Sequence, residues 1–169
     1  MSVELAISGE SPADQEWLRQ AFHDYLTELT RYDPSYHHLV RQLEAAPEAF
    51  RRWYGQESIS TLIIRSLGRN TGFVVVARAP FAYVSPGRDY RLGEFFIQES
   101  HRRQGLGLVA AREVFRRRPG RWEVTQISSN RPAVLFWRRV ITECAAGAYE
   151  DILSDGRRRQ SFTIAPERP

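Results

Sequence analysis

The spacing of apolar residues along the chain divides it into strands and helices. Alternating or short unbroken apolar runs between turn residues predict strands, and recurrence every three or four positions predicts helices. On these rules strands are expected over residues 3–8, 59–65, 73–78, 91–98, 121–128, 145–153 and 159–164, and helices over 12–30, 36–54, 105–117 and 131–141. Pro47 is expected to break or restart the second helix, because proline removes a backbone hydrogen bond.

The order of these elements predicts an α/β fold with a mixed sheet. The helix over 105–117 is long enough to be a right-handed crossover, so strands 91–98 and 121–128 should be parallel. Asp155 and Gly156 predict a tight turn in a closing hairpin. No repeat or interdomain linker is evident, so residues 1–169 are expected to form a single domain.

Composition indicates a globular protein and the kind of compartment in which it works. The chain has 169 residues, 42 % of them apolar, which is enough for a globular core. Its one cysteine, Cys144, excludes an internal disulfide and indicates a reducing compartment. The first residues do not resemble a signal peptide, and the apolar runs are too short to span a membrane. We therefore expect a cytoplasmic protein without a membrane partner.

All the basic side chains apart from histidine are arginines. The sequence has 24 arginines, no lysine and a net charge of +4. The arginines fall in small scattered groups among twenty acids, which indicates a mixed-charge surface and not a nucleic-acid site.

The region around residues 92–115 has the pattern of an anion site. A strand containing Phe95, Phe96 and Ile97 is followed by a polar connector, and Gly105 and Gly107 then open a helix. The first N–H groups of a helix lack internal partners and attract anions, and glycine lets a ligand approach the backbone. Arg102 and Arg103 add positive charge, so a phosphate or pyrophosphate is the expected ligand.

Two common phosphate-binding motifs do not fit this region fully. The Walker loop requires a lysine, which the chain lacks. Residues 105–110 do match the dinucleotide pattern GxGxxA, with Glu123 as a candidate ribose ligand. However, about seven polar residues separate the strand from the glycines, and more than half the chain precedes them.

Arg102-x-x-Gly105-x-Gly107 instead resembles the acyl-CoA pyrophosphate loop of the GNAT N-acetyltransferase superfamily, (Q/R)xxGx(G/A). A second pattern about 25 residues later, Asn130-x-x-Ala133-x-x-Phe136-Trp137, resembles that family's other motif. The order of elements in the second half also matches. The resemblance covers about residues 60–145.

The resemblance implies a GNAT-like fold: a mostly antiparallel twisted sheet with one parallel β-α-β pair and helices on both faces. It implies acetyl-CoA as co-substrate, with pantetheine paired along the strand and pyrophosphate on the loop. The implied cofactor-binding residues are Phe95, Phe96, Ile97, Arg102, Arg103, Gln104, Gly105, Leu106, Gly107, Leu108, Asn130 and Trp137. Asn130 can equally be an ordinary helix N-cap.

Glu94 is the candidate catalytic base, directly or through a water; it can also bind substrate or simply pair with Arg91. Trp137 stands where many family members have a tyrosine that protonates the leaving thiolate. An indole cannot do this, so Tyr83 or Tyr90 would have to serve, or activity is weak. Trp137 can also be plain core packing.

The acceptor is expected to be a primary amine of a small molecule or peptide. Tyr32, Asp33 and Tyr36 are candidates to cradle a cationic amine, whereas His37 and His38 do not have the spacing of a metal site. The sequence thus predicts an acetyl-CoA-dependent N-acetyltransferase. The alternative is a GNAT-fold acyl-CoA-binding protein with little or no activity. A homodimer through the last hairpin is possible but not required.

Overall fold

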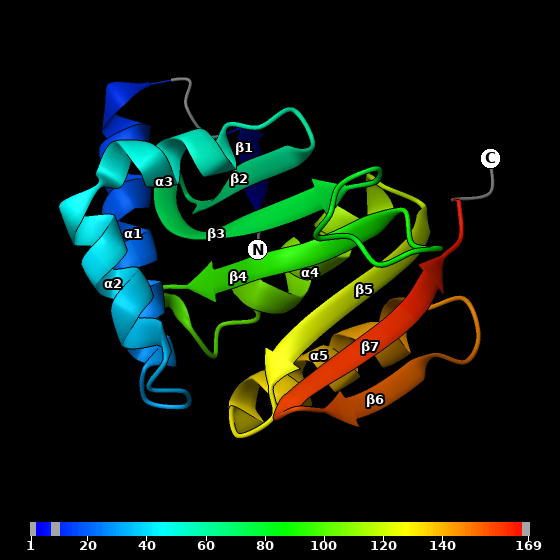
Figure 1. Ribbon diagram of the computed structural model, residues 1–169. Coiled ribbons are helices and arrows are strands. Elements are labelled where there is room, and N and C mark those ends of the chain that lie inside the picture. Colours follow the sequence, from blue (N-terminus) through cyan, green and yellow to red (C-terminus); the bar gives the residue numbers. More distant parts are fainter. Residues whose placement is uncertain (1–2, 8–10, 167–169) are drawn as a thin grey trace.

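The computed structural model describes residues 3–7 and 11–166 of the chain (Figure 1). Its elements are β1 (Glu4–Ile7), α1 (Pro12–Leu29), α2 (Tyr36–Ala45), α3 (Pro47–Tyr54), β2 (Ile59–Ser66), β3 (Arg69–Arg78), β4 (Tyr90–Ile97), a 3-10 turn (Glu99–His101), α4 (Leu106–Arg116), β5 (Gly120–Ile127), α5 (Arg131–Cys144), β6 (Glu150–Ser154) and β7 (Arg157–Ile164). No helix of the described residues is both long and apolar enough to cross a membrane.

The strands of the described residues form one sheet in the order β1-β2-β3-β4-β5-β7-β6. Every neighbouring pair is antiparallel except β4 and β5, which are parallel as the crossover argument predicts. The β4–β5 register covers only Tyr90–Leu92 against Trp122–Val124. Beyond these residues the two strands diverge, so the sheet opens at their carboxyl ends (Figure 1).

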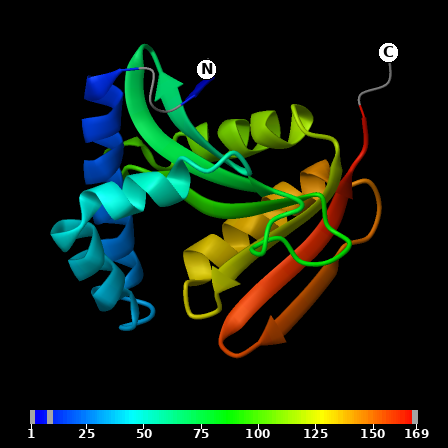
Figure 2. The same ribbon diagram turned by 45° about the horizontal axis from the view of Figure 1, so that its top comes forward.

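Helices pack on both faces of the sheet, which confirms the predicted layers (Figures 1 and 2). On one face α1 and α2 cover β2 to β4, around Phe22, Phe73 and Phe96. On the other face α4 and α5 lie over a core that contains Trp122 and Trp137. Buried aromatic side chains of this size contribute strongly to stability through the apolar area they remove from water.

Local signals set several boundaries as expected. The Ser11 hydroxyl accepts a hydrogen bond from the Asp14 N–H and Pro12 occupies the first turn of α1. Pro47 begins a new helix, α3, so the predicted stretch 36–54 is divided at Ala46.

Other predicted boundaries were wrong. The turn between β2 and β3 is only Leu67 and Gly68, both at positive φ, so β3 starts at Arg69 and not at residue 73. β6 begins at Glu150 and not at residue 145, because residues 145–149 form the connection from α5, which turns at Gly147 with a positive φ. Ser8, the predicted end of the first strand, lies outside the described residues.

Candidate active site

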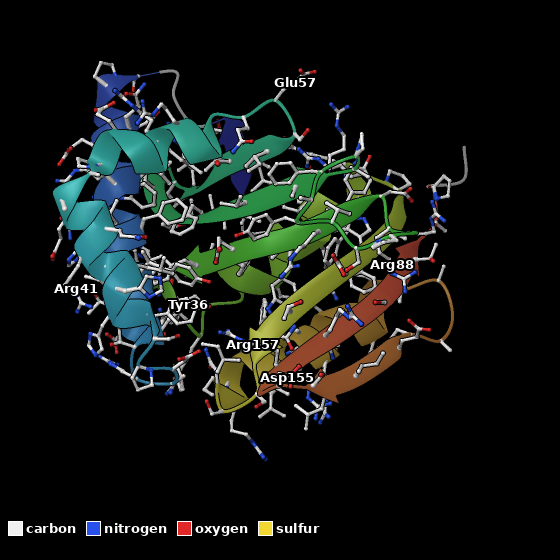
Figure 3. The ribbon with its side chains drawn as sticks, viewed as in Figure 1. Tyr36, Arg41, Glu57, Arg88, Asp155 and Arg157 are labelled. Carbon is white, nitrogen blue, oxygen red and sulfur yellow. The ribbon has the colours of Figure 1, made fainter. Side chains whose placement is uncertain are left out.

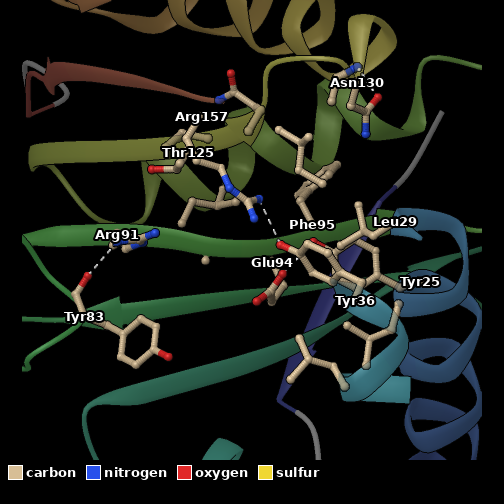
Figure 4. Close-up of a pocket in the computed structure, with 18 of the residues that line it drawn as sticks. Tyr25, Leu29, Tyr36, Tyr83, Arg91, Glu94, Phe95, Thr125, Asn130 and Arg157 are labelled. Atoms are coloured by element: carbon tan, nitrogen blue, oxygen red, sulfur yellow. Dashed lines mark hydrogen bonds between the residues drawn. The ribbon is translucent and has the colours of Figure 1, made fainter. Parts of the chain in front are cut away.

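A cleft of about 850 Å³ lies where β4 and β5 diverge (Figure 4). One wall comes from α1 and α2, and the opposite wall comes from β5, the start of α5 and the start of β7. The polar and aromatic side chains that line it are Tyr25, Tyr36, Gln42, Tyr83, Arg91, Glu94, Phe95, Thr125, Gln126, Asn130, Trp137 and Arg157. The cleft therefore brings together residues from almost the whole length of the chain.

A β-bulge at Gly93 turns Glu94 into this cleft. Val76 of β3 pairs with Leu92 and Val75 pairs with Glu94, so Gly93 is an extra residue on β4. Residues two apart on a regular strand point to the same face. Because of the bulge, Leu92 packs into the core on the α4–α5 side, whereas Glu94 points to α1.

Glu94 is held by a phenol and has an altered acidity. The Tyr25 hydroxyl donates a hydrogen bond of 2.5 Å to Glu94 Oε2. Burial raises the pKa of Glu94 to about 7, although the bond from Tyr25 and the charges of Arg91 and Arg157 act in the opposite direction. The carboxyl can thus exchange a proton near neutral pH. Arg91 does not bond to it: its Nη1 donates to the Tyr83 carbonyl (3.1 Å) and lies 3.9 Å from Glu123.

A second polar cluster lies at the same cleft (Figure 3). Arg157, at the start of β7, donates to the Tyr36 hydroxyl (3.1 Å) and to Asp33 Oδ2 (2.9 Å). Hydrogen bonds from Ser35 and the charge of Arg157 lower the pKa of Asp33, and burial raises the pKa of Tyr36. The Tyr32 carbonyl accepts a bond from Ser129. The predicted amine cradle of Tyr32, Asp33 and Tyr36 therefore has its carboxylate already paired.

The two glycines of the loop between β4 and α4 have different structural requirements. Gly105 lies at φ +80°, a left-handed conformation, and caps the amino end of α4. At Gly107 a Cβ would lie 3.3 Å from the Phe136 ring, so a larger residue would press against α5. Gly105 is thus needed for its backbone angle and Gly107 for close packing.

The polar side chains of this loop differ in their contacts and exposure. The Arg102 guanidinium donates two hydrogen bonds to the Glu28 carboxylate of α1 in a bidentate arrangement (3.0 and 2.6 Å). It also donates to the Ile97 carbonyl (2.7 Å). Its guanidinium therefore ties the loop to α1. Arg103 and Gln104 are exposed, and the Gln104 amide donates to the Ser100 carbonyl.

The two predicted residues of α5 have structural partners and also line the cleft. Asn130 caps the helix, because its side chain accepts a bond from the Ala133 N–H (3.2 Å). Trp137 is only 5 % exposed and packs edge-on against Phe95, with ring centres 5.2 Å apart. Both structural alternatives raised by the sequence are therefore present.

The remaining candidates lie at different depths. Phe95 lines the cleft, whereas the side chains of Phe96 and Ile97 are buried in the two cores. Leu106 is buried and Leu108 packs against the core. Tyr83 lines the cleft and Tyr90 packs on Trp122.

Several side chains weighed in the alternative interpretations lie away from the cleft lining. His37 and His38 are exposed, and no group of metal-ligating side chains occurs among the described residues. Glu123, the candidate ribose ligand, is fully buried and accepts the Ser85 N–H.

Tyr25 and Arg157, which make the hydrogen bonds of the two polar clusters, are absent from the sequence-based candidates. Tyr25 occupies a helical position typical of core packing, and Arg157 begins a run of three arginines. Neither has a local signal of function, because their partners are 69 and more than 100 residues away in the sequence.

No protein-family model and no curated protein sequence matches the chain. Solved structures do. An acetyltransferase from Thermus thermophilus superposes with a TM-score of 0.68 and 17 % identity, over 97 % of this chain and 98 % of that one. The PaiA N-acetyltransferase of Thermoplasma acidophilum, in complex with coenzyme A, gives 0.57 and 11 %, over 97 % and 100 %. A GNAT family acetyltransferase of Elizabethkingia anophelis with acetyl-CoA bound gives 0.53 and 11 %, over 96 % and 97 %.

Each superposition covers nearly the whole length of both chains, although the sequence identities are low. This chain has a parallel pair of strands that diverges, a glycine loop that leads into α4, and helices on both faces of the sheet. The chain has the fold of the GNAT acetyltransferases.

Proposed function

We propose that this protein is an acetyl-CoA-dependent N-acetyltransferase that acts on a primary amine of a small molecule or peptide. The observation that carries the proposal is Glu94, a carboxyl with a pKa of about 7 in the cleft between the diverging parallel strands. The glycine loop follows β4 at this same end of the sheet. A donor site and a proton acceptor thus lie together.

The donor is expected to lie between β4 and β5. The β4–β5 register ends at Leu92, so the edge of β4 from Gly93 to Ile97 can pair with the peptide-like pantetheine arm. The backbone N–H groups at the start of α4, from Gly105 to Leu108, would hold the pyrophosphate, with Arg103 and Gln104 exposed beside them. Arg102 would shape the loop through Glu28, and Asn130 and Trp137 would line the arm.

The reaction would be direct transfer. Glu94 takes a proton from the ammonium form of the acceptor, directly or through a water, and the neutral nitrogen then attacks the thioester carbonyl carbon. A backbone N–H of β4 stabilises the oxygen that gains charge. The C–S bond then breaks, the nitrogen loses its second proton, and the leaving thiolate takes up one proton to become the thiol of CoA. A pKa of about 7 suits this role, because a substantial fraction of the carboxyl is ionised near neutral pH while the carboxylate is still basic enough to accept a proton.

Trp137 supports the alternative function, an acyl-CoA-binding protein with little transfer activity. The buried indole offers no acid for the thiolate. The phenols of Tyr25, Tyr36 and Tyr83 line the cleft and are other sources of a proton. Release of CoA in the presence of amines separates the two functions.

The first experiment is titration calorimetry with acetyl-CoA and CoA, with NAD and random duplex DNA as comparison ligands. We expect micromolar binding of acetyl-CoA and CoA that is lost in Gly105→Glu. Gly68→Glu is a matched control, because Gly68 also lies at positive φ (+72°) with open space around it, but in the β2–β3 turn. If acetyl-CoA does not bind, or both variants weaken it equally, the proposed donor site is wrong.

A further inference from the structure

The charges around the cleft restrict which amines can enter it. Among the described residues that line it, Glu94 is the one carboxylate, whereas Arg91 and Arg157 both carry positive charge. Glu94 is only partly ionised near neutral pH. An acceptor with several ammonium groups would therefore place positive charge beside two guanidinium groups, whose neighbouring carboxylates, Glu123 and Asp33, lie outside the cleft lining.

Arg157 is already committed to the protein. Its guanidinium bonds to Asp33 and Tyr36 and lies 5.5 Å from the centre of the Tyr36 ring. These contacts join α2 to β7 across the gap between the diverging strands. Arg157 thus forms part of the wall and has few donors left for a ligand.

Arg91 is differently placed. Its side chain is 28 % exposed, and its hydrogen bonds to described residues use one of five N–H groups, the one to the Tyr83 carbonyl. Glu123 lies 3.9 Å away, beyond hydrogen-bond distance, and is fully buried, so it can fix the guanidinium without covering it. The planar fork of arginine matches the two oxygens of a carboxylate.

We propose that the acceptor is an amine that also carries a carboxylate, of the amino-acid class, with its carboxylate on Arg91 and its amine at Glu94. This inference rests on the proposed acetyltransferase function. Arg91 and Glu94 line the cleft from one strand, separated by Leu92 and the bulged Gly93, so a short molecule can reach both (Figure 4). Leu39, Leu43 and Tyr36 line the facing wall and favour an apolar or aromatic side chain on the acceptor.

The test compares amino acids with the amines that lack only the carboxylate. The pairs are L-leucine with 3-methylbutylamine, L-phenylalanine with 2-phenylethylamine, and L-methionine with 3-(methylthio)propylamine, with CoA release as the readout. We expect kcat/KM for at least one amino acid to exceed that of its amine about 10-fold or more. Arg91→Gln should remove this preference by lowering kcat/KM for the amino acid about 10- to 100-fold relative to kcat/KM for its amine. The charge of Arg91 also lowers the pKa of Glu94, but losing that effect changes both substrates alike and cancels in the ratio.

Arg159→Gln is the control variant. It makes the same change of charge on β7, at an exposed residue outside the lining of the cleft, and should alter neither substrate. The inference is overturned if amines react as well as amino acids, if Arg91→Gln affects both equally, or if acetyl-CoA binds and no amino acid is acetylated. Failure of acetyl-CoA to bind would instead overturn the proposed function itself.

Discussion

Two tyrosines in the cleft are each bonded to a charged side chain, and the direction of the hydrogen bond differs between them. Tyr25 donates a hydrogen bond to Glu94, whereas Tyr36 accepts a hydrogen bond from Arg157. The pKa of Glu94 is raised to about 7 because the half-buried carboxyl loses much of its contact with water, and the hydrogen bond from Tyr25 offsets this only in part. Arg157 also has the Asp33 carboxylate and remains a fixed cation.

The difference assigns separate roles to two clusters of similar composition. A carboxyl whose ionised form is disfavoured by burial can take up and release protons, and this is what a general base requires. A guanidinium bonded to a carboxylate and a phenol instead fixes α2 and the loop before it against the start of β7. The Tyr25–Glu94 pair is thus suited to chemistry, and the Asp33–Tyr36–Arg157 cluster to holding the cleft in shape.

The largest expected effect is on turnover when Glu94 is changed. Glu94→Gln keeps the size of the side chain but cannot accept a proton, so kcat/KM should fall about 100- to 1,000-fold and the limb of its pH profile that Glu94 governs should disappear. Asp33→Asn is the matched control, because it removes a carboxylate from the other cluster. It should raise KM for the amine and keep the pH profile. An unchanged pH–rate profile in Glu94→Gln would exclude the base role.

The stability of the protein should depend on pH through the same carboxyl. Its pKa rises from an ordinary value of 4.5 to about 7 in the folded protein, so folding favours the protonated form. The stability that Glu94 contributes is therefore complete below about pH 4.5 and is lost as the pH rises through about 7.

Glu94→Gln does not titrate in this range. Its free energy of unfolding, measured by urea denaturation, should increase relative to that of the unaltered protein between pH 5 and pH 8. A difference between the two proteins that stays constant over this range would show that the pKa of Glu94 is not raised.

A smaller effect should distinguish the two phenols. The hydrogen bond from Tyr25 lowers the pKa of Glu94. Tyr25→Phe should therefore move the acidic limb of the pH–rate profile upward by about 0.5 to 1 pH unit. Tyr36→Phe removes a hydroxyl that bonds to Arg157 and should leave this limb in place. Equal displacement by both variants would contradict the separation of roles.

The sequence by itself determined the order of the elements and the glycine loop. Gly105 and Gly107 act through backbone angle and close packing within a few residues of the loop or against the next helix, so their pattern is readable along the chain. The parallel pairing of β4 and β5 follows from the length of the helix between them. Glu94 could be singled out because it immediately precedes the strand segment expected to meet the donor.

Only the tertiary structure decided what surrounds Glu94. The bulge at Gly93 depends on the register with β3, and a shift of one residue would have turned Glu94 to the opposite face. Tyr25 has the spacing of a core residue, and Arg157 has the composition of a charged surface, until the fold brings both to the cleft. Contacts between residues so far apart leave no local pattern, because each side chain obtains its chemistry from partners that the chain reaches only when folded.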